Sequence, residues 1–173
     1  MPPPSYLSPS LPYPAAVKVA VYYTGKTAEK YLRTGEEIYA GRLKHYLPID
    51  FYVLPDVRQG GKLTPERLVV AEGETLLGKL SPDDHLVLLD EAGEGYSSEE
   101  FAAWMEKQLH RPARRLVFVV GGAYGFSPDV YARANHKLRL SRMTFSHQMV
   151  RLFFTEQLYR AMTILRNEKY HNP

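Results

Sequence analysis

Two short segments of this sequence are apolar at every position, and they constrain the fold more than any other feature. They are residues 86–89 (LVLL) and 116–120 (LVFVV). A strand with one face in water alternates apolar and polar side chains, whereas a strand covered on both faces is apolar throughout. The two segments therefore predict central strands of a mainly parallel sheet with helices on both faces, which is an α/β fold.

The remaining sequence alternates between strand and helix patterns. Strands are expected at 17–23, 49–54, 85–90 and 115–122, with a further strand-like stretch at 138–143, and helices at 27–47, 65–80, 98–109, 127–135 and 147–166. Residues 81–84 and 91–96 are expected to form turns or loops. Pro65 suits the first turn of its helix, and Ser97 with Glu100 has the pattern of a capping box.

Two of the expected helices carry apolar stripes. In the helix at 27–47, one face is expected to hold Tyr31, Leu32, Ile38, Tyr39, Leu43 and Leu47, although Gly35 and Gly41 weaken the helix. The helix at 147–166 has a broad stripe of Val150, Phe153, Phe154, Leu158, Ala161 and Leu165. This breadth favours either a helix buried in the core or one shared between the core and a dimer interface.

The chain of 173 residues is the length of one domain, with a distinctive leader. Residues 1–16 contain six prolines and lack the basic and apolar regions of a signal peptide. We expect residues 1–16 to be a disordered extension, with a docked arm as the alternative, and 17–173 to form a single domain. No apolar run is long enough to span a bilayer. The absence of cysteine excludes a disulfide scaffold, a Cys-ligated metal and a thiol nucleophile, which fits a cytoplasmic protein.

Positive charge is concentrated near the C-terminus, although the net charge of the chain is only +3. Residues 133–171 contain eight cations against two acidic residues, Glu156 and Glu168; the cations are Arg133, Lys137, Arg139, Arg142, Arg151, Arg160, Arg166 and Lys169. Such a stretch predicts a surface that contacts phosphates, as in nucleic-acid binding. A solvated helix face is the alternative interpretation.

Ligands of open α/β sheets bind beyond the carboxyl ends of the strands. Three segments are expected there: 89–93, 121–125 and 140–147. Gly121 and Gly122 allow a ligand to approach the backbone or simply allow a tight turn. The run matches neither the dinucleotide-binding glycine pattern nor a phosphate-binding loop. His147 and Arg151 are one helical turn apart and are expected to share a face near the start of their helix.

Four motifs in series resemble a known family. They are GGAYGFSP (121–128), LRLSRMTFSHQ (138–148, close to the family pattern LSLSKMTFPHQ), VRLFFTEQLYRA (150–161) and ILRNEKYH (164–171). Together, over residues 17–171, they resemble the RlmH family of the SPOUT class, bacterial methyltransferases of large-subunit rRNA. The resemblance implies a C-terminal trefoil knot that binds S-adenosylmethionine, and a homodimer. It also implies methylation of N3 of a pseudouridine in helix 69 of 23S rRNA within assembled ribosomes.

The resemblance also implies roles for particular residues, and it implies no metal. Cofactor contacts are expected at Leu89, Gly121, Gly122, Leu140, Ser141, Arg142, Met143, Thr144 and Phe145. RNA contacts are expected at Arg142, Glu156, Arg160 and Arg166, and catalytic positions at His147, Arg151, Tyr170 and His171. We expect His147 or His171 to take the N3 proton, Arg151 or Arg142 to stabilise the oxygens of the base, and Tyr170 to pack over the methyl donor.

Several features leave alternatives open. Ala123 and Ser146 stand where many members of the family have other residues, and the chain ends in Asn172-Pro173. A SPOUT enzyme acting on another RNA atom, such as a ribose hydroxyl or a tRNA base, shares the fold and the cofactor. A non-catalytic ribosome-binding module would retain the fold alone. A flavodoxin-like nucleotide binder fits the alternation of strands and helices but lacks any signal for a phosphate loop.

Overall fold

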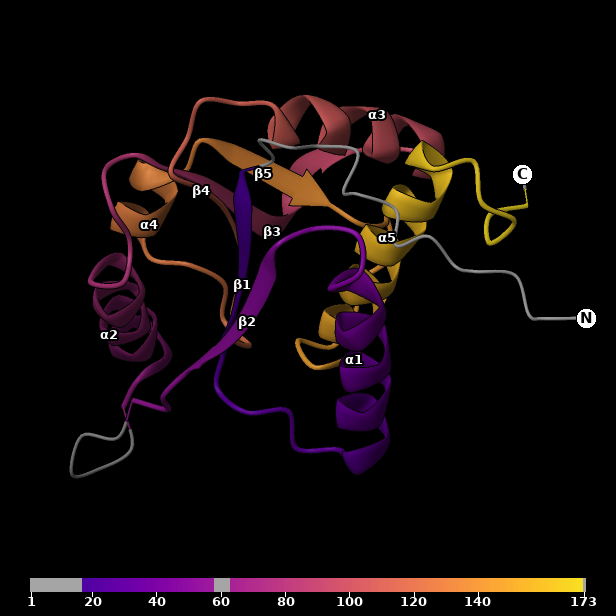
Figure 1. Cartoon of the computed structure of the whole chain (residues 1–173). Coiled ribbons are helices and arrows are strands. Elements are labelled where there is room, and N and C mark those ends of the chain that lie inside the picture. Colours follow the sequence, from indigo (N-terminus) through magenta and orange to yellow (C-terminus); the bar gives the residue numbers. More distant parts are fainter. Residues whose placement is uncertain (1–16, 58–62, 173) are drawn as a thin grey trace, which may run out of the picture.

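The computed structural model describes residues 17–57 and 63–172 (Figure 1). The described elements are β1 (Lys18–Thr24), α1 (Lys30–Leu43), β2 (Ile49–Leu54), α2 (Pro65–Leu77), β3 (Asp84–Gly95), α3 (Ser98–Leu109), β4 (Arg115–Val120), α4 (Pro128–Arg133), β5 (His136–Arg139) and α5 (Met149–Leu165). The proline-rich residues 1–16, expected to be a disordered extension, lie outside the described residues.

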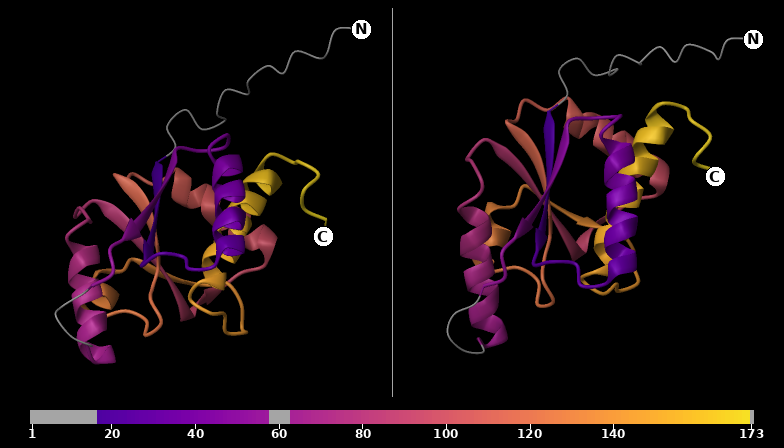
Figure 2. Two further views of the ribbon diagram at one scale, coloured as in Figure 1. Left: turned by 90° about the horizontal axis from the view of Figure 1, so that it is seen from below. Right: turned by 60° about the horizontal axis from the view of Figure 1, so that its bottom comes forward.

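The five strands form one sheet in the order β2-β1-β4-β3-β5, and every neighbouring pair is parallel. The prediction that 86–89 and 116–120 are central strands is confirmed, because Leu86–Leu88 and Leu116–Val120 are buried. Figure 1 and Figure 2 show α1, α3 and α5 on one face of the sheet and α2 and α4 on the other. The fold is therefore the expected α/β sandwich of three layers.

The predicted helix starts are confirmed at α2 and α3. Pro65 occupies the first turn of α2. At α3 the Ser97 hydroxyl accepts the Glu100 N–H at 3.2 Å, while the Glu100 carboxylate accepts the Ser97 N–H at 2.7 Å. This reciprocal pair satisfies two N–H groups that the helix cannot pair itself.

Helix α1 is shorter than the expected 27–47, and the prediction of its buried face is wrong in part. Leu32 and Leu43 are buried, whereas Tyr31 and Ile38 are 64% and 48% exposed. The helix instead packs on α5 at Gly35, where a Cβ would lie 2.8 Å from a methyl of Leu152. The glycine that weakens the helix thus permits its close packing, and this packing turns Tyr31 and Ile38 outward.

The segment 91–96, expected to be a loop, mostly continues β3. The register of β3 against β5 shifts between Leu89 and Glu94, and pairing then resumes through Glu94 and Gly95. Gly93 makes this possible, because a Cβ there would lie only 2.7 Å from the backbone of Leu138. The strand expected at 138–143 is also corrected, because β5 is His136–Arg139 and the chain from 140 to 148 is irregular.

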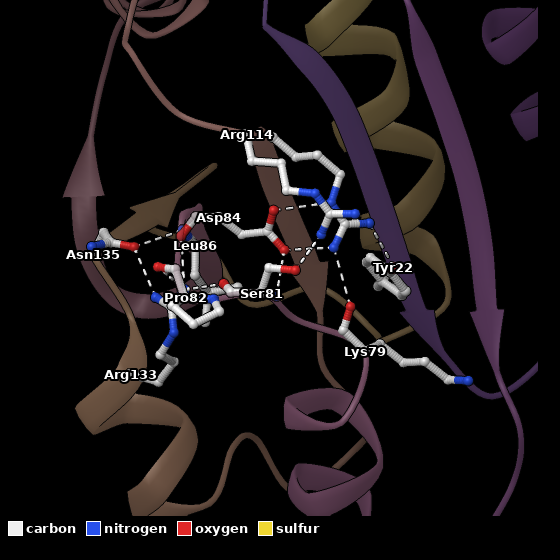
Figure 3. A network of polar contacts seen from close by, with 10 residues as sticks. Tyr22, Lys79, Ser81, Pro82, Asp84, Leu86, Arg114, Arg133 and Asn135 are labelled. Atoms are coloured by element: carbon white, nitrogen blue, oxygen red, sulfur yellow. Dashed lines mark hydrogen bonds and ion pairs between the residues drawn. The ribbon is translucent and has the colours of Figure 1, made fainter.

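A partly buried polar network fixes the passage from α4 into β5 (Figure 3). Arg133 donates to the carbonyl oxygens of Ser81 at 2.9 Å and Asp84 at 2.8 Å. It also donates to Asn135 Oδ1 at 3.1 Å, and this oxygen accepts the Leu86 N–H at 2.7 Å. The network ties the start of β5 to the start of β3 and thereby places the residues that follow β5.

Candidate active site

A cavity of about 650 Å³ lies beyond the carboxyl ends of β3 and β4. Its lining comes from the three expected segments: Leu89–Ala92, residues 120–123 with 125–126, and residues 138–141 with 143–147, joined by Tyr131 and Val150. The three segments expected beyond the strand ends therefore lie around one cavity. A volume of this size falls in the range of roughly 300–1,000 Å³ that is usual for small-molecule sites.

Two glycines form the turn that follows β4, and both line the cavity. A Cβ at Gly121 would lie 3.0 Å from the Phe126 ring, and a Cβ at Gly122 would lie 3.0 Å from the Glu72 carboxylate. Gly125 has a φ of 78°, in the left-handed region that favours glycine. Larger residues at these positions would therefore crowd Phe126 and Glu72, so the glycines suit this tight turn at the edge of the cavity.

Most of the expected cofactor residues line the cavity. Those that do are Leu89, Gly121, Gly122, Leu140, Ser141, Met143, Thr144 and Phe145. The Ser141 hydroxyl accepts the Met143 N–H at 2.9 Å, and the Phe145 ring packs on Phe153 with centroids 4.9 Å apart. Arg142 is exposed and outside the lining, so the structure separates it from the residues on either side of it.

Asp90, Tyr131 and Arg139 also line the cavity. The sequence places Asp90 in an expected ligand segment and Arg139 among the basic residues of 133–171, but it assigns neither to the cofactor and does not single out Tyr131. The Tyr131 hydroxyl donates to Asp90 Oδ2 at 2.5 Å, while Asp90 Oδ1 accepts the Ala92 N–H at 2.8 Å. Burial and the Asp90 carboxylate together raise the pKa of Tyr131 to about 12. The sequence does distinguish Arg139, because this arginine stands where the family pattern LSLSKM has a serine. No comparable signal marks Tyr131.

His147 lines the cavity but does not belong to α5, which begins at Met149. Its pKa is lowered, first by partial burial and then by the positive charge of Arg151. The imidazole is therefore neutral at pH 7 and able to accept a proton. The expectation that His147 and Arg151 share a helical face is wrong, because His147 precedes the helix.

Arg151 is buried, with only 1% of its surface exposed. Its Nη2 donates to the carbonyl of Thr24 at 2.6 Å, and its Nη1 donates to the carbonyl of Gly25 and the hydroxyl of Thr27, both at 3.0 Å. These bonds hold the start of α5 against the segment after β1. The expectation that Arg151 stabilises the base finds no support in this geometry, because the guanidinium is engaged with the chain itself.

The residues expected near the C-terminus form a separate C-terminal cluster, consisting of Glu156, Arg160, Tyr170 and His171. Arg160 pairs with Glu156 at 2.6 Å, and the Tyr170 hydroxyl donates to the same carboxylate at 2.9 Å. His171 contacts Glu99 at 2.7 Å and Arg160 at 3.4 Å. No residue of this cluster lines the cavity. Within one subunit, therefore, His147 lies apart from Tyr170 and His171.

The basic surface is smaller than the sequence of residues 133–171 suggests. Arg166 lies over the Tyr46 ring at 4.3 Å and donates to the carbonyl of His45 at 3.4 Å. Arg133, Arg151 and Arg160 are likewise engaged with groups of the chain itself. Within residues 17–57 and 63–172, the cations without a hydrogen bond or ion pair in this C-terminal stretch are Lys137, Arg139, Arg142 and Lys169.

No helix among the described residues combines the length and apolar character needed to cross a membrane. Among those residues there is also no group of three or more His, Asp and Glu side chains placed to hold a metal ion.

A parallel α/β sheet with a cavity beyond the carboxyl ends of its central strands is an architecture in which enzymes bind nucleotide-like cofactors. Residues 17–171 match the family model described as "Predicted SPOUT methyltransferase". The chain belongs to this SPOUT methyltransferase family, and SPOUT methyltransferases use S-adenosylmethionine.

Three relatives share the name "Ribosomal RNA large subunit methyltransferase H". The protein of Porphyromonas gingivalis is 51% identical over 156 residues, which cover 90% of this chain and 99% of the relative. That of Christiangramia forsetii is 50% identical over 148 residues, covering 86% and 94%. That of Cytophaga hutchinsonii is 46% identical over 156 residues, covering 90% and 100%. The expected resemblance and the expectation of an enzyme are confirmed.

Proposed function

We propose that this enzyme transfers a methyl group from S-adenosylmethionine to N3 of a pseudouridine in helix 69 of 23S rRNA, within assembled ribosomes. The observation that carries the proposal is the cavity in which the three segments assigned to the cofactor meet. The names of the three relatives support rRNA of the large subunit as the substrate. Acting on ribosomes, the enzyme would reside in the cytoplasm.

The residues of the cavity fit S-adenosylmethionine. Apolar side chains of Leu89, Leu140, Phe145 and Val150 suit an adenosine, and the glycine turn offers open backbone. We assign the cofactor to this lining, in which residues 140–145 other than Arg142 provide one wall; in the family this segment forms part of the knot. When bound, S-adenosylmethionine supplies a methyl group made electrophilic by its sulfonium.

The N3 atom of pseudouridine carries a proton that must leave, so the site needs a base. His147 is our candidate, because it lines the cavity and its lowered pKa keeps it neutral at pH 7. His171 is the weaker candidate, since both of its ring nitrogens are engaged, one with Glu99 and one with Arg160. Arg142, exposed beside the cavity, would stabilise the negative charge that develops on the base.

A homodimer would complete this site. The C-terminal cluster lies outside the cavity of its own subunit. Tyr170, Arg160 and Glu156 of a second copy would therefore be the ones that reach RNA bound at this cavity. Exposed apolar side chains on the neighbouring helices α1 and α5, namely Tyr31, Ile38 and Phe153, support an interface there. Sedimentation of the protein at micromolar concentration tests this, and a monomer would contradict it.

The decisive experiment combines purified enzyme, labelled S-adenosylmethionine and three acceptors: assembled ribosomes, free 23S rRNA and tRNA. We expect label in ribosomes alone, and mass spectrometry should place the methyl group on a helix 69 pseudouridine base. Label on a ribose or in tRNA would instead indicate a SPOUT enzyme with another target atom. Binding to ribosomes should weaken steeply with salt if Arg142 and Lys169 contact phosphates, and an affinity independent of salt would contradict these contacts.

A further inference from the structure

One guanidinium lines the cavity without a partner. Arg139 ends β5 and is half-buried, yet no hydrogen bond or ion pair joins its guanidinium to the described part of the chain. It lies against Gly95, where a Cβ would be 3.2 Å from Nη2 and 3.3 Å from Nε. The extension of β3 therefore leaves room for this guanidinium beside the cavity, while its donors remain free for a ligand.

The charged side chains of the lining form a simple pattern. Among the described residues that line the cavity, Asp90 and Glu91 carry negative charge and Arg139 is the permanent cation. His147 is neutral at pH 7 because its pKa is lowered. S-adenosylmethionine carries the opposite set: a sulfonium and an ammonium, both positive, and one carboxylate. The carboxylates of Asp90 and Glu91 thus match the two positive groups of S-adenosylmethionine, and the Arg139 guanidinium matches its one carboxylate.

We propose that Arg139 binds the carboxylate of the methionine portion of S-adenosylmethionine; this assignment rests on the proposed function. A guanidinium presents parallel N–H donors to the two oxygens of a carboxylate, and such charge-assisted pairs are stronger than neutral hydrogen bonds. The arginine departs from the family pattern LSLSKM, which has a serine at the position where this sequence, LRLSRM, has Arg139.

An RNA phosphate is the other anion that Arg139 could meet. A phosphodiester approaching this cavity would also face the carboxylates of Asp90 and Glu91, and like charges brought together oppose binding. Arg142 and Lys169 are exposed and lie outside the cavity lining, so they can contact phosphates without that penalty. The charge pattern therefore favours the cofactor carboxylate over the RNA.

Calorimetric titration tests the assignment with two ligands, S-adenosylmethionine and its decarboxylated analogue, which keeps both cations. The proteins are wild type, Arg139→Gln, Arg139→Lys and the control Lys137→Gln. Lys137 lies on the same strand and its variant loses the same charge, but Lys137 does not line the cavity. Thermal melts establish that each variant folds.

For S-adenosylmethionine we expect Arg139→Gln to weaken binding about tenfold, the loss typical of a hydrogen bond to a charged group. Arg139→Lys should recover part of that loss because it keeps the charge but not the paired donors. Wild type and Arg139→Gln should bind the decarboxylated analogue equally. The loss of the guanidinium and the loss of the carboxylate are then not additive in binding free energy. Lys137→Gln should match wild type with both ligands.

Three results would overturn the assignment. Equal losses for both ligands in Arg139→Gln would mean that Arg139 does not act through the carboxylate. Unchanged cofactor binding with weaker, less salt-dependent binding to ribosomes would assign Arg139 to a phosphate. Failure of the wild-type protein to bind S-adenosylmethionine would remove the proposed function itself, and with it this assignment, so the two failures are distinguishable.

Discussion

Arg115 donates to the Asp84 carboxylate at two points, with Nε 3.0 Å from Oδ1 and Nη2 2.5 Å from Oδ2. The Asp84 side chain is wholly buried, and that of Arg115 is 14% exposed. Burial alone would raise the pKa of Asp84, but the hydrogen bonds from Arg115 and from the Ser81 N–H outweigh it and lower the pKa. The pair therefore joins the first residues of β3 and β4 in their ionised forms.

Replacing Asp84 with alanine should destabilise the fold strongly. The substitution leaves the Arg115 guanidinium partly buried without its counter-charge, and the loss of one partner of a buried pair costs about 3 kcal/mol. Urea unfolding at pH 7 measures this change. The control is Asp50→Ala, which breaks an exposed ion pair with Lys18 and should change stability little.

The contribution of Asp84 should also disappear in acid. Its folded pKa lies below its unfolded value of about 3.9, so its stabilisation is complete above that pH and is lost as the pH falls through the folded pKa. The stability difference between wild type and Asp84→Ala should accordingly shrink towards pH 2. A difference that is constant between pH 7 and pH 2 would contradict the ionised pair.

Replacing His147 with glutamine should slow methyl transfer by about 10²–10⁴-fold, the usual contribution of a general base. Binding of S-adenosylhomocysteine should change far less, because His147 is proposed to act on the N3 proton. In wild type the lowered pKa means that activity stays constant through neutral pH and falls only below the ordinary histidine value of about 6.5. Single-turnover rates on ribosomes measure both, and near-normal turnover in the variant would remove His147 from this role.

Removing Arg151 should raise the pH below which activity is lost. Its positive charge helps to lower the pKa of His147, so Arg151→Met should raise this pKa and shift the loss of activity to higher pH. The variant should also lose stability, since the carbonyls of Thr24 and Gly25 lose a buried donor. Arg151→Lys keeps the charge and should keep the pH profile. If the pH–activity profile of folded Arg151→Met were not shifted, the role of Arg151 would be confined to packing.

The sequence predicts well those features that depend on local pattern. Apolar runs identify the central strands, the Ser97–Glu100 pair identifies a helix start, and the rule that ligands bind at carboxyl ends of strands brings three segments to one cavity. The arginines were less predictable. Arg133, Arg151 and Arg166 donate to backbone carbonyls far away in the sequence, and local spacing contains no information about those partners.

The path of the chain after Leu89 was also not predictable, because it depends on contacts between distant segments. Residues 91–96 have the glycines of a loop, yet Glu94 and Gly95 pair with β5 once β5 lies beside them. The start of α5 at Met149 was likewise missed, and with it the separation of exposed His147 from buried Arg151. A spacing of four residues implies a shared face only within a helix.

Gly93 provides a further test of how the fold builds the cavity. A Cβ at Gly93 would lie 2.7 Å from the backbone N and C atoms of Leu138, and backbone cannot move aside as a flexible side chain can. Gly93→Ala should therefore disrupt the pairing of β3 with β5 and displace the cavity wall at 138–141. We expect the free energy of unfolding to fall by about 2 kcal/mol, as for other strained or overpacked sites, together with weaker binding of S-adenosylmethionine.

Gly41→Ala is the matched control for Gly93→Ala. Gly41 is an exposed residue of α1, and a Cβ there would meet no atom within 4 Å. Alanine should stabilise this helix by about 0.5–1 kcal/mol because it costs less backbone entropy than glycine. Urea unfolding and calorimetric titration of both variants compare the two sites directly. If Gly93→Ala matched wild type in stability and in cofactor affinity, the close contact of the β3 extension with β5 would not be needed to form the cavity.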